Sequence, residues 1–255
     1  MFGQGLIFGG FSAVPLTIDY FLVAGGRAGN SRYSPGGNGG GNNFISAFEL
    51  ESGAYTVTVG GTGSPTSLAT ITTVTSAPTT TSPLGTFNAG NPIGPGVNTF
   101  QHGGGGAGGG ANGQNSSAPN TFNQFNPANS PAHAGNGGNG NAQPTFGGTW
   151  SGGGGAAETV IGTWGIPNPW ISSYGGSGGG SPSQWLADFS APYNNDAAAN
   201  TGGGGGGMYS TPGQGGSGIA KIRYLTADGE ATGGTITTSG AYKIHTFTTS
   251  GTFTY

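Results

Sequence analysis

The chain has 255 residues, of which 60 are glycine, 16 are proline and none is cysteine, and its formal net charge at pH 7 is −3. The lack of cysteine excludes disulfides and thiolate chemistry, and so mild a charge, with no Lys or Arg between Arg32 and Lys221, predicts no nucleic-acid partner. No apolar run approaches the ~20 residues of a membrane span, so no membrane insertion is expected, and the first residues lack the basic start of a signal peptide.

Residues 1–16 form an apolar, aromatic arm in which glycines separate the large side chains. These side chains are too few for a core of their own. The arm is therefore expected to pack either on the chain's own domain or on a partner protein. On the second interpretation it is a docking arm, and its contact residues are Phe2, Leu6, Ile7, Phe8 and Phe11.

Four stretches are predicted as β-strands, because β-branched and aromatic residues dominate them and glycines lie beside them. One of them alternates cleanly, with Tyr55, Val57 and Val59 on one face. Since these strands bracket the glycine-rich region, we expect a small sheet that clamps its ends. The four stretches are residues 17–24, 54–59, 68–76 and 219–225.

Glycine runs fill the region between the strands, and the longest, residues 202–207, is expected to organise the rest. Such runs are either flexible linkers or extended left-handed threefold helices of the polyproline-II type. High Gly and Pro content is typical of disorder, but only 5% of the residues are charged, whereas disorder is favoured by high net charge. We therefore favour an ordered bundle, in which only glycine lets the backbones approach closely enough to pair their N–H and C=O groups. The other runs are residues 36–41, 103–110, 135–140, 152–155 and 175–180.

The remaining segments are loops and a C-terminal unit. Residues 77–101 and 111–134 are loops rich in Pro, Asn, Thr, Ser and Phe, and no amphipathic helix of useful length is visible. The expected fold is mostly irregular and β: a bundle of polyglycine-II helices (left-handed, threefold), a small flanking β-sheet and a C-terminal Thr-rich β unit. The expected domains are a docking arm at 1–16, a glycine-rich domain with clamping strands at 17–225, and the Thr-rich unit at 226–255, whose last strand follows a turn at Ser250-Gly251.

No constellation of residues indicates catalysis. Residues 213–218 fit G-x-G-x-x-G, but a strand follows where a dinucleotide site needs a helix. Glu158 and Asp188 could be the paired acids of a glycoside hydrolase, although lone surface carboxylates explain them better. The three histidines lack metal-ligand spacing and are interpreted as loop or surface residues. The sequence therefore predicts no enzyme, no cofactor and no metal. The histidines are His102, His133 and His245.

All four tryptophans fall between glycine blocks. If glycine helices run back and forth, the segments between them are turns, and turns at one end of a rigid stack lie side by side. Aromatic side chains on such loops are typical of recognition surfaces. The alternative is that they cap a bundle whose glycine core has no side chains. On the first interpretation the receptor-binding residues are Trp150, Trp164, Trp170, Tyr174, Trp185, Phe189 and Tyr193.

Several of these stretches together resemble a known family. The stretches DYFLVAGG, AYTVTVGG and GGSGIAKIRY, with glycine blocks between them, resemble the glycine-rich domain of bacteriophage tail-fibre proteins, and the final GGTITTSGAYKIHTFTTSGTFTY resembles the Thr-rich β segment that often accompanies it. The architecture is also similar to the polyglycine-II sandwich adhesins at the tips of long tail fibres. The resemblance implies a host-recognition module on a virion.

Two functions follow from these expectations. The first is a virion-associated adhesin that binds a host surface protein or glycan through its aromatic loops, with another virion fibre or capsid protein as its docking partner. The second is a structural virion component without adhesive function, such as a capsid fibre or decoration protein. An ice-binding protein is a weaker alternative, because the chain lacks a strict Gly-x-x repeat, and a depolymerase would need a catalytic constellation.

Overall fold

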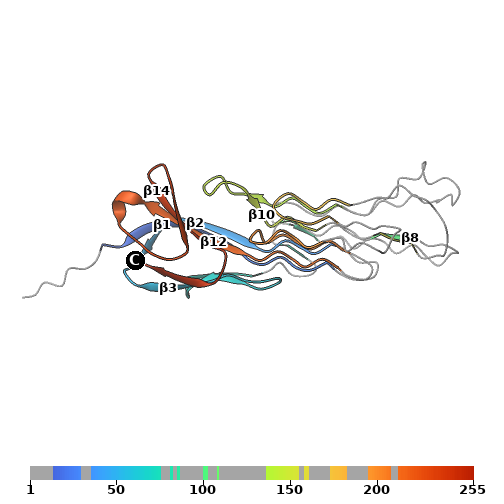
Figure 1. The fold of residues 1–255 in the computed structure, drawn as a ribbon, viewed down its shortest axis with the longest axis horizontal. Helices are drawn as coiled ribbons and strands as arrows, with labels where there is room; N and C mark the ends of the chain where they lie inside the picture. The colour runs from blue at the N-terminus through green and yellow to red at the C-terminus, as the bar shows by residue number, and fades with distance from the viewer. Residues whose placement is uncertain are drawn as a thin grey trace, which may run out of the picture.

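Two β-sheets lie at one end of the described molecule, and the glycine runs extend away from them (Figure 1). The computed structural model describes residues 14–29, 36–75, 136–154, 173–182, 195–207 and 212–255, Gly108, and the backbone of four short strands. Within this part of the chain the one helical element is the 3-10 turn η2 (Thr226–Asp228). No described helix is long and apolar enough to cross a membrane. The expectation of a mostly β fold that is almost free of helix is confirmed.

The larger sheet has five antiparallel strands in the order β13-β14-β12-β1-β2. The predicted strands at 17–24 and 219–225 are its two central strands, β1 and β12. The long edge strand β2 was not predicted, because a bulge at Ala47, which has a φ of 53°, interrupts its alternation. The strands are β1 (Leu16–Val23), β2 (Asn42–Leu50), β12 (Ile219–Leu225), β13 (Thr235–Ser239) and β14 (Tyr242–Phe247).

The smaller sheet has four antiparallel strands in the order β15-β3-β4-β5. The strand predicted at 54–59 is β3. The prediction of one strand at 68–76 was wrong: a hairpin turns there, because Ala69 takes a left-handed φ of 43° and ends β4. The strands are β3 (Ala54–Thr58), β4 (Thr66–Leu68), β5 (Thr72–Val74) and β15 (Gly251–Thr254).

The C-terminal residues 226–255 belong to both sheets. β14 pairs with β12 in the larger sheet, while β15 pairs with β3 in the smaller one. The expected turn at Ser250-Gly251 is thus a crossing from one sheet to the other. Between the sheets lies an apolar core to which β1 contributes alternate residues and the smaller sheet contributes Val57, Leu68 and Phe253.

The strands lead directly into the glycine runs. β1 continues into residues 24–29, β2 follows residues 36–41, and β12 follows residues 212–218. Because strand pairing fixes the register of the residues at each strand end, the sheets set how the adjoining runs align. The larger sheet adjoins these three runs at one of their ends, and its role as a clamp stays a prediction.

Residues 202–207 are the central run of the bundle and are buried along their whole length. Backbone hydrogen bonds of 2.7–3.1 Å join this run to six surrounding segments. A Cβ on Gly204 would lie 1.9 Å from the carbonyl oxygen of Gly37, so a larger residue does not fit there without displacing the backbone. The six segments are residues 24–29, 36–41, 151–154, 173–182, 195–198 and 212–218.

The hydrogen bonds between runs recur every three residues. Gly37 and Gly40 donate to the central run at Gly205 and Gly202, so donors three residues apart meet acceptors three residues apart. The same spacing joins Gly213 and Gly216 to the central run, Gly26 and Gly29 to residues 212–218, Ala24 and Arg27 to residues 36–41, and Gly137 and Gly140 to residues 173–182.

Three further strand pairs lie outside the two sheets. Their strands are only two or three residues long, so each pair gives a local hairpin or contact rather than a layer. The pairs are β9 (Asn141–Ala142) with β10 (Thr149–Trp150), β8 (Phe100–His102) with β11 (Glu158–Val160), and β6 (Thr81–Ser82) with β7 (Gly85–Thr86).

Candidate functional site

The hairpin of β9 and β10 covers the face of the larger sheet that points away from the smaller sheet. Trp150, at its end, is only 6% exposed, and its ring centroid lies 5.1 Å from that of Phe21 in an edge-on arrangement. The ammonium of Lys221 sits 4.9 Å from the ring centroid, and burial lowers the pKa of this lysine. Trp150 therefore covers the sheet and offers little surface to a partner.

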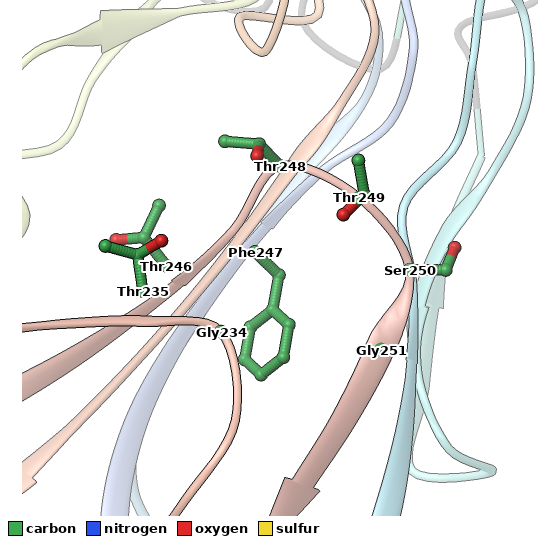
Figure 2. A pocket seen from close by; sticks show the side chains of 8 residues that line it. All are labelled: Gly234, Thr235, Thr246, Phe247, Thr248, Thr249, Ser250 and Gly251. Atoms are coloured by element: carbon green, nitrogen blue, oxygen red, sulfur yellow. The ribbon is translucent and has the colours of Figure 1, made fainter.

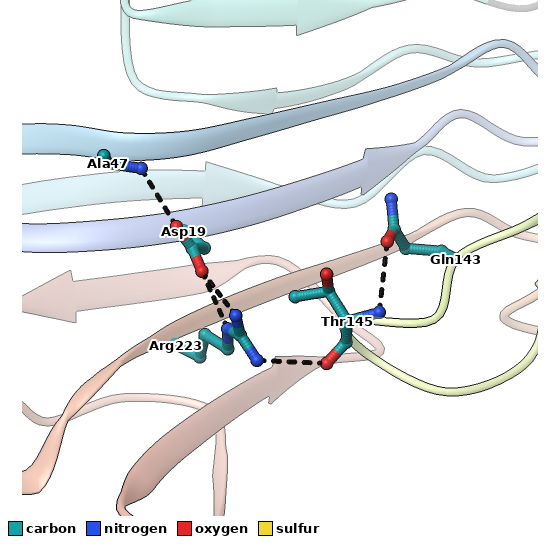
Figure 3. A network of polar contacts seen from close by, with 5 residues as sticks. All are labelled: Asp19, Ala47, Gln143, Thr145 and Arg223. Atoms are coloured by element: carbon teal, nitrogen blue, oxygen red, sulfur yellow. Dashed lines mark hydrogen bonds and ion pairs between the residues drawn. The ribbon is translucent and has the colours of Figure 1, made fainter.

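Arg223 connects this hairpin to the larger sheet. Its Nε and Nη2 both lie 2.8 Å from Asp19 Oδ2, and its Nη1 donates to the Thr145 carbonyl at 3.4 Å. The guanidinium also lies 4.3 Å from the ring centroid of Tyr242. The other oxygen of Asp19 accepts the N–H of Ala47 at 2.9 Å, so one network reaches from the β2 bulge to the hairpin (Figure 3). The network joins strands β1, β2 and β12 to the hairpin.

Tyr174 is the one predicted receptor-binding residue that the described part of the chain presents to solvent, with 68% of its surface exposed. Its backbone is fixed: the Tyr174 N–H donates to Asn136 Oδ1 at 2.7 Å, and its carbonyl accepts the Gly137 N–H at 2.8 Å. An exposed ring on a fixed backbone suits binding, because the backbone loses little conformational freedom when a partner makes contact.

The other predicted contact residues lie outside the described residues. For the receptor surface these are Trp164, Trp170, Trp185, Phe189 and Tyr193. For the docking arm they are Phe2, Leu6, Ile7, Phe8 and Phe11. Both sets stay predictions. The described chain begins at Val14, which is 78% exposed, while Leu16 is already a buried residue of β1.

Five of the seven predicted aromatics lie in two segments whose flanking residues meet at one end of the bundle. Residues 155–172 join Gly154 to Ser173, and residues 183–194 join Pro182 to Asn195. Gly154 donates to Gly37, and Asn195 accepts from Gly206, at the end of the central run farther from the sheets. The described residues that flank both segments therefore lie at the end of the bundle away from the two sheets.

His245 is buried, with 0% exposure, so its interpretation as a loop or surface residue was wrong. It lies on β14, on the face that joins the core between the sheets, where its Nδ1 is 2.7 Å from the Gly233 carbonyl and its Nε2 is 3.4 Å from the Tyr224 hydroxyl. That hydroxyl accepts the N–H of Ala231 at 2.9 Å. The alternation of residues in β14 could have shown that His245 and Phe247 share a face. It could not have shown that this face is the buried one.

A shallow hollow of about 220 Å³ lies where β14 leaves the larger sheet and the chain crosses to β15 (Figure 2). Its lining has hydroxyl groups but no charged side chain. One of these groups, Ser250 Oγ, already accepts the N–H of Val59 at 3.0 Å. Among the described residues no three His, Cys, Asp or Glu side chains come together as metal ligands would. The hydroxyl-bearing residues are Thr235, Thr246, Thr248, Thr249 and Ser250.

Comparison with known families adds one assignment. A family described as "Glycine-rich domain" matches residues 11–225, which is most of the chain. The chain belongs to the glycine-rich domain family. The match ends at Leu225, the last residue of β12, so it spans β1, β2, β3 and the glycine runs. Comparisons with curated proteins and with solved structures give no match.

Proposed function

We propose that the runs of this glycine-rich domain are polyglycine-II helices, and that the protein is a virion-associated adhesin of a bacteriophage tail fibre. In this proposal the aromatic segments between runs bind a host surface protein or glycan, and the N-terminal arm docks on another virion fibre or capsid protein. The proposal assigns the protein no catalytic role.

The three-residue repeat of the backbone hydrogen bonds supports the helical assignment. A threefold helix turns the same groups toward the same neighbour at every third residue, which is the spacing at which Gly37 and Gly40 donate to Gly205 and Gly202. The six neighbours of the central run also fit a bundle of rods rather than a sheet, in which a strand has two neighbours.

The observation that carries the functional proposal is that the residues flanking both aromatic segments lie at the same end of the bundle. The described residues that flank 155–172 and 183–194 lie at the end of the bundle away from the sheets, and these two segments hold three of the four tryptophans. Tyr174 is exposed beside the first of them. Aromatic side chains on a pre-organised scaffold give a large contact area at low ordering cost.

The experiment that tests this proposal measures cell binding by a triple variant in which Trp164, Trp170 and Trp185 are replaced by Ala. We expect the variant to keep its thermal unfolding transition and to lose saturable binding to host cells, because aromatic anchors carry most of the energy of such contacts. Leu225→Ala is the matched control, since Leu225 is a partly exposed apolar residue at the opposite end of the molecule.

Two outcomes decide between the alternatives. A triple variant that binds cells as strongly as the unchanged chain contradicts the assignment of the aromatic segments. If the unchanged chain binds virus particles but no host cell, the function is that of a structural virion component.

A further inference from the structure

Strand β13 forms the outer edge of the larger sheet. The sheet ends there, and no described strand lies beyond β13. All five residues of the strand are exposed, and Ile236 in its middle keeps 46% of its surface in contact with solvent. Ile236 lies opposite His245 in the sheet, so it shares the face that covers the core.

The hairpin geometry identifies which backbone groups of β13 are free. Two residues, Gly240 and Ala241, join Ser239 to Tyr242, and Gly240 at the first position has the φ of 59° that a type II′ turn requires. In such a turn Ser239 and Tyr242 exchange backbone hydrogen bonds. From there along β13, the backbone N–H and C=O groups point alternately toward β14 and away from it. The N–H and C=O groups of Ile236 and Thr238 therefore point away from β14.

The other edges of the two main sheets, at β2, β15 and β5, are protected. β2 carries the Ala47 bulge, whose N–H is taken by Asp19, and it also carries a charge at Glu49. The edge of β15 is closed by Thr232, which exchanges two backbone hydrogen bonds with Thr254, of 2.9 and 3.1 Å. β5 is only three residues long. Bulges, charges and short strands are the usual ways of blocking an edge, and β13 has none of them.

We propose that β13 pairs antiparallel with β13 of a second copy of this chain. Residues 231–242 carry no charge, so two copies of the strand do not repel one another, and four β-branched residues in a row favour extended pairing. With Thr237 on the twofold axis, Ile236 of each copy lies opposite Thr238 of the other. The outward groups of both residues are then paired, and Ile236 is covered.

A contact of this size gives weak association in dilute solution, because one short strand pair buries far less surface than a stable dimer does. It becomes effective where copies are held close together, since tethering raises the local concentration to the millimolar range. The inference is independent of the adhesin proposal, because β13 lies in the sheets and not among the aromatic segments.

The test is sedimentation of the full chain between about 10 µM and about 1 mM, compared with the variants Thr238→Pro and Thr238→Ala. Proline removes the outward N–H of residue 238 and leaves the pairing with β14 intact, which is the position where an edge strand tolerates proline. Alanine removes the same side chain but keeps the N–H. We expect the unchanged chain and Thr238→Ala to dimerise alike, and Thr238→Pro to dimerise at least about tenfold more weakly.

Equal self-association of all three proteins, or a monomer throughout the concentration range, would overturn the proposal. Hydrogen exchange on the unchanged chain tests it without any substitution. The amides of Ile236 and Thr238 should exchange more slowly at the higher concentration, while the amide of Thr237, which already points toward β14, should not change. Exchange of Ile236 and Thr238 that is independent of concentration would also overturn it.

Discussion

His245 shows how one buried side chain makes the stability of the fold depend on pH. Burial lowers its pKa below the ordinary value of 6.5, the Gly233 carbonyl acts in the opposite direction, and the nearby charges of Lys243 and Glu230 oppose one another. The ring packs edge-on against Phe253, with centroids 5.0 Å apart. The neutral form therefore fits the site better than the charged form.

Acidification is expected to destabilise the protein through His245. Below about pH 6.5 the unfolded chain binds a proton that the folded chain does not yet bind, so the free energy of unfolding falls until the pH reaches the lower folded pKa. Above pH 6.5 both states are neutral, and His245 adds no pH dependence. Urea unfolding at a series of pH values should show this slope in the unchanged chain.

The variant His245→Gln is the control, because it keeps a polar side chain at the site without an imidazole. Its unfolding free energy should lack the part of the slope below about pH 6.5 that His245 contributes. Identical slopes in the two proteins would show that His245 titrates alike in the folded and unfolded states.

At the scale of elements, residue patterns predict some parts of the fold and miss others. β1, β3 and β12 are predictable because each is a run of β-branched and aromatic residues beside glycines. β2 was not predicted, because the bulge at Ala47 interrupts the alternation of apolar and polar residues. The burial of Trp150 is set by contacts with strands far away in the sequence, since β10 packs on β1 and β12. The residues around Trp150 in the sequence therefore could not show whether its ring is buried in the fold or exposed to a partner.

The central run depends on the absence of side chains, which one substitution can test. Gly204→Ala would bring a Cβ to 1.9 Å from the Gly37 carbonyl oxygen, so backbones must separate, and we expect a loss of about 1–3 kcal/mol or more in the free energy of unfolding. Urea unfolding measures the loss.

Gly61→Ala is the matched control for Gly204→Ala. No atom lies within 4 Å of the Cβ position at Gly61, so its replacement should leave stability within about 1 kcal/mol of the unchanged chain. Equal effects of the two substitutions would mean that the packing of the central run adds little to stability.

At the scale of the whole molecule, the two ends of the described structure differ in composition and in packing. Two sheets share a core at one end and fix the register of the runs that leave them, while the described residues that flank the segments with three of the four tryptophans lie at the other end. Backbone hydrogen bonds that recur every three residues hold the runs between the two ends together. Recognition at one end and docking near the other is the arrangement that the proposed adhesin requires.

The most direct measurement is the binding of the purified chain to intact host cells, with a parallel sample that lacks residues 1–13. The deletion stops before Leu16, which is buried in β1, and before Val14, whose carbonyl accepts the Tyr255 hydroxyl at 2.8 Å. The account predicts saturable binding to cells by both forms and loss of binding to virus particles by the shortened one. Binding to cells by neither form, with the full chain still attaching to particles, would contradict the adhesin proposal.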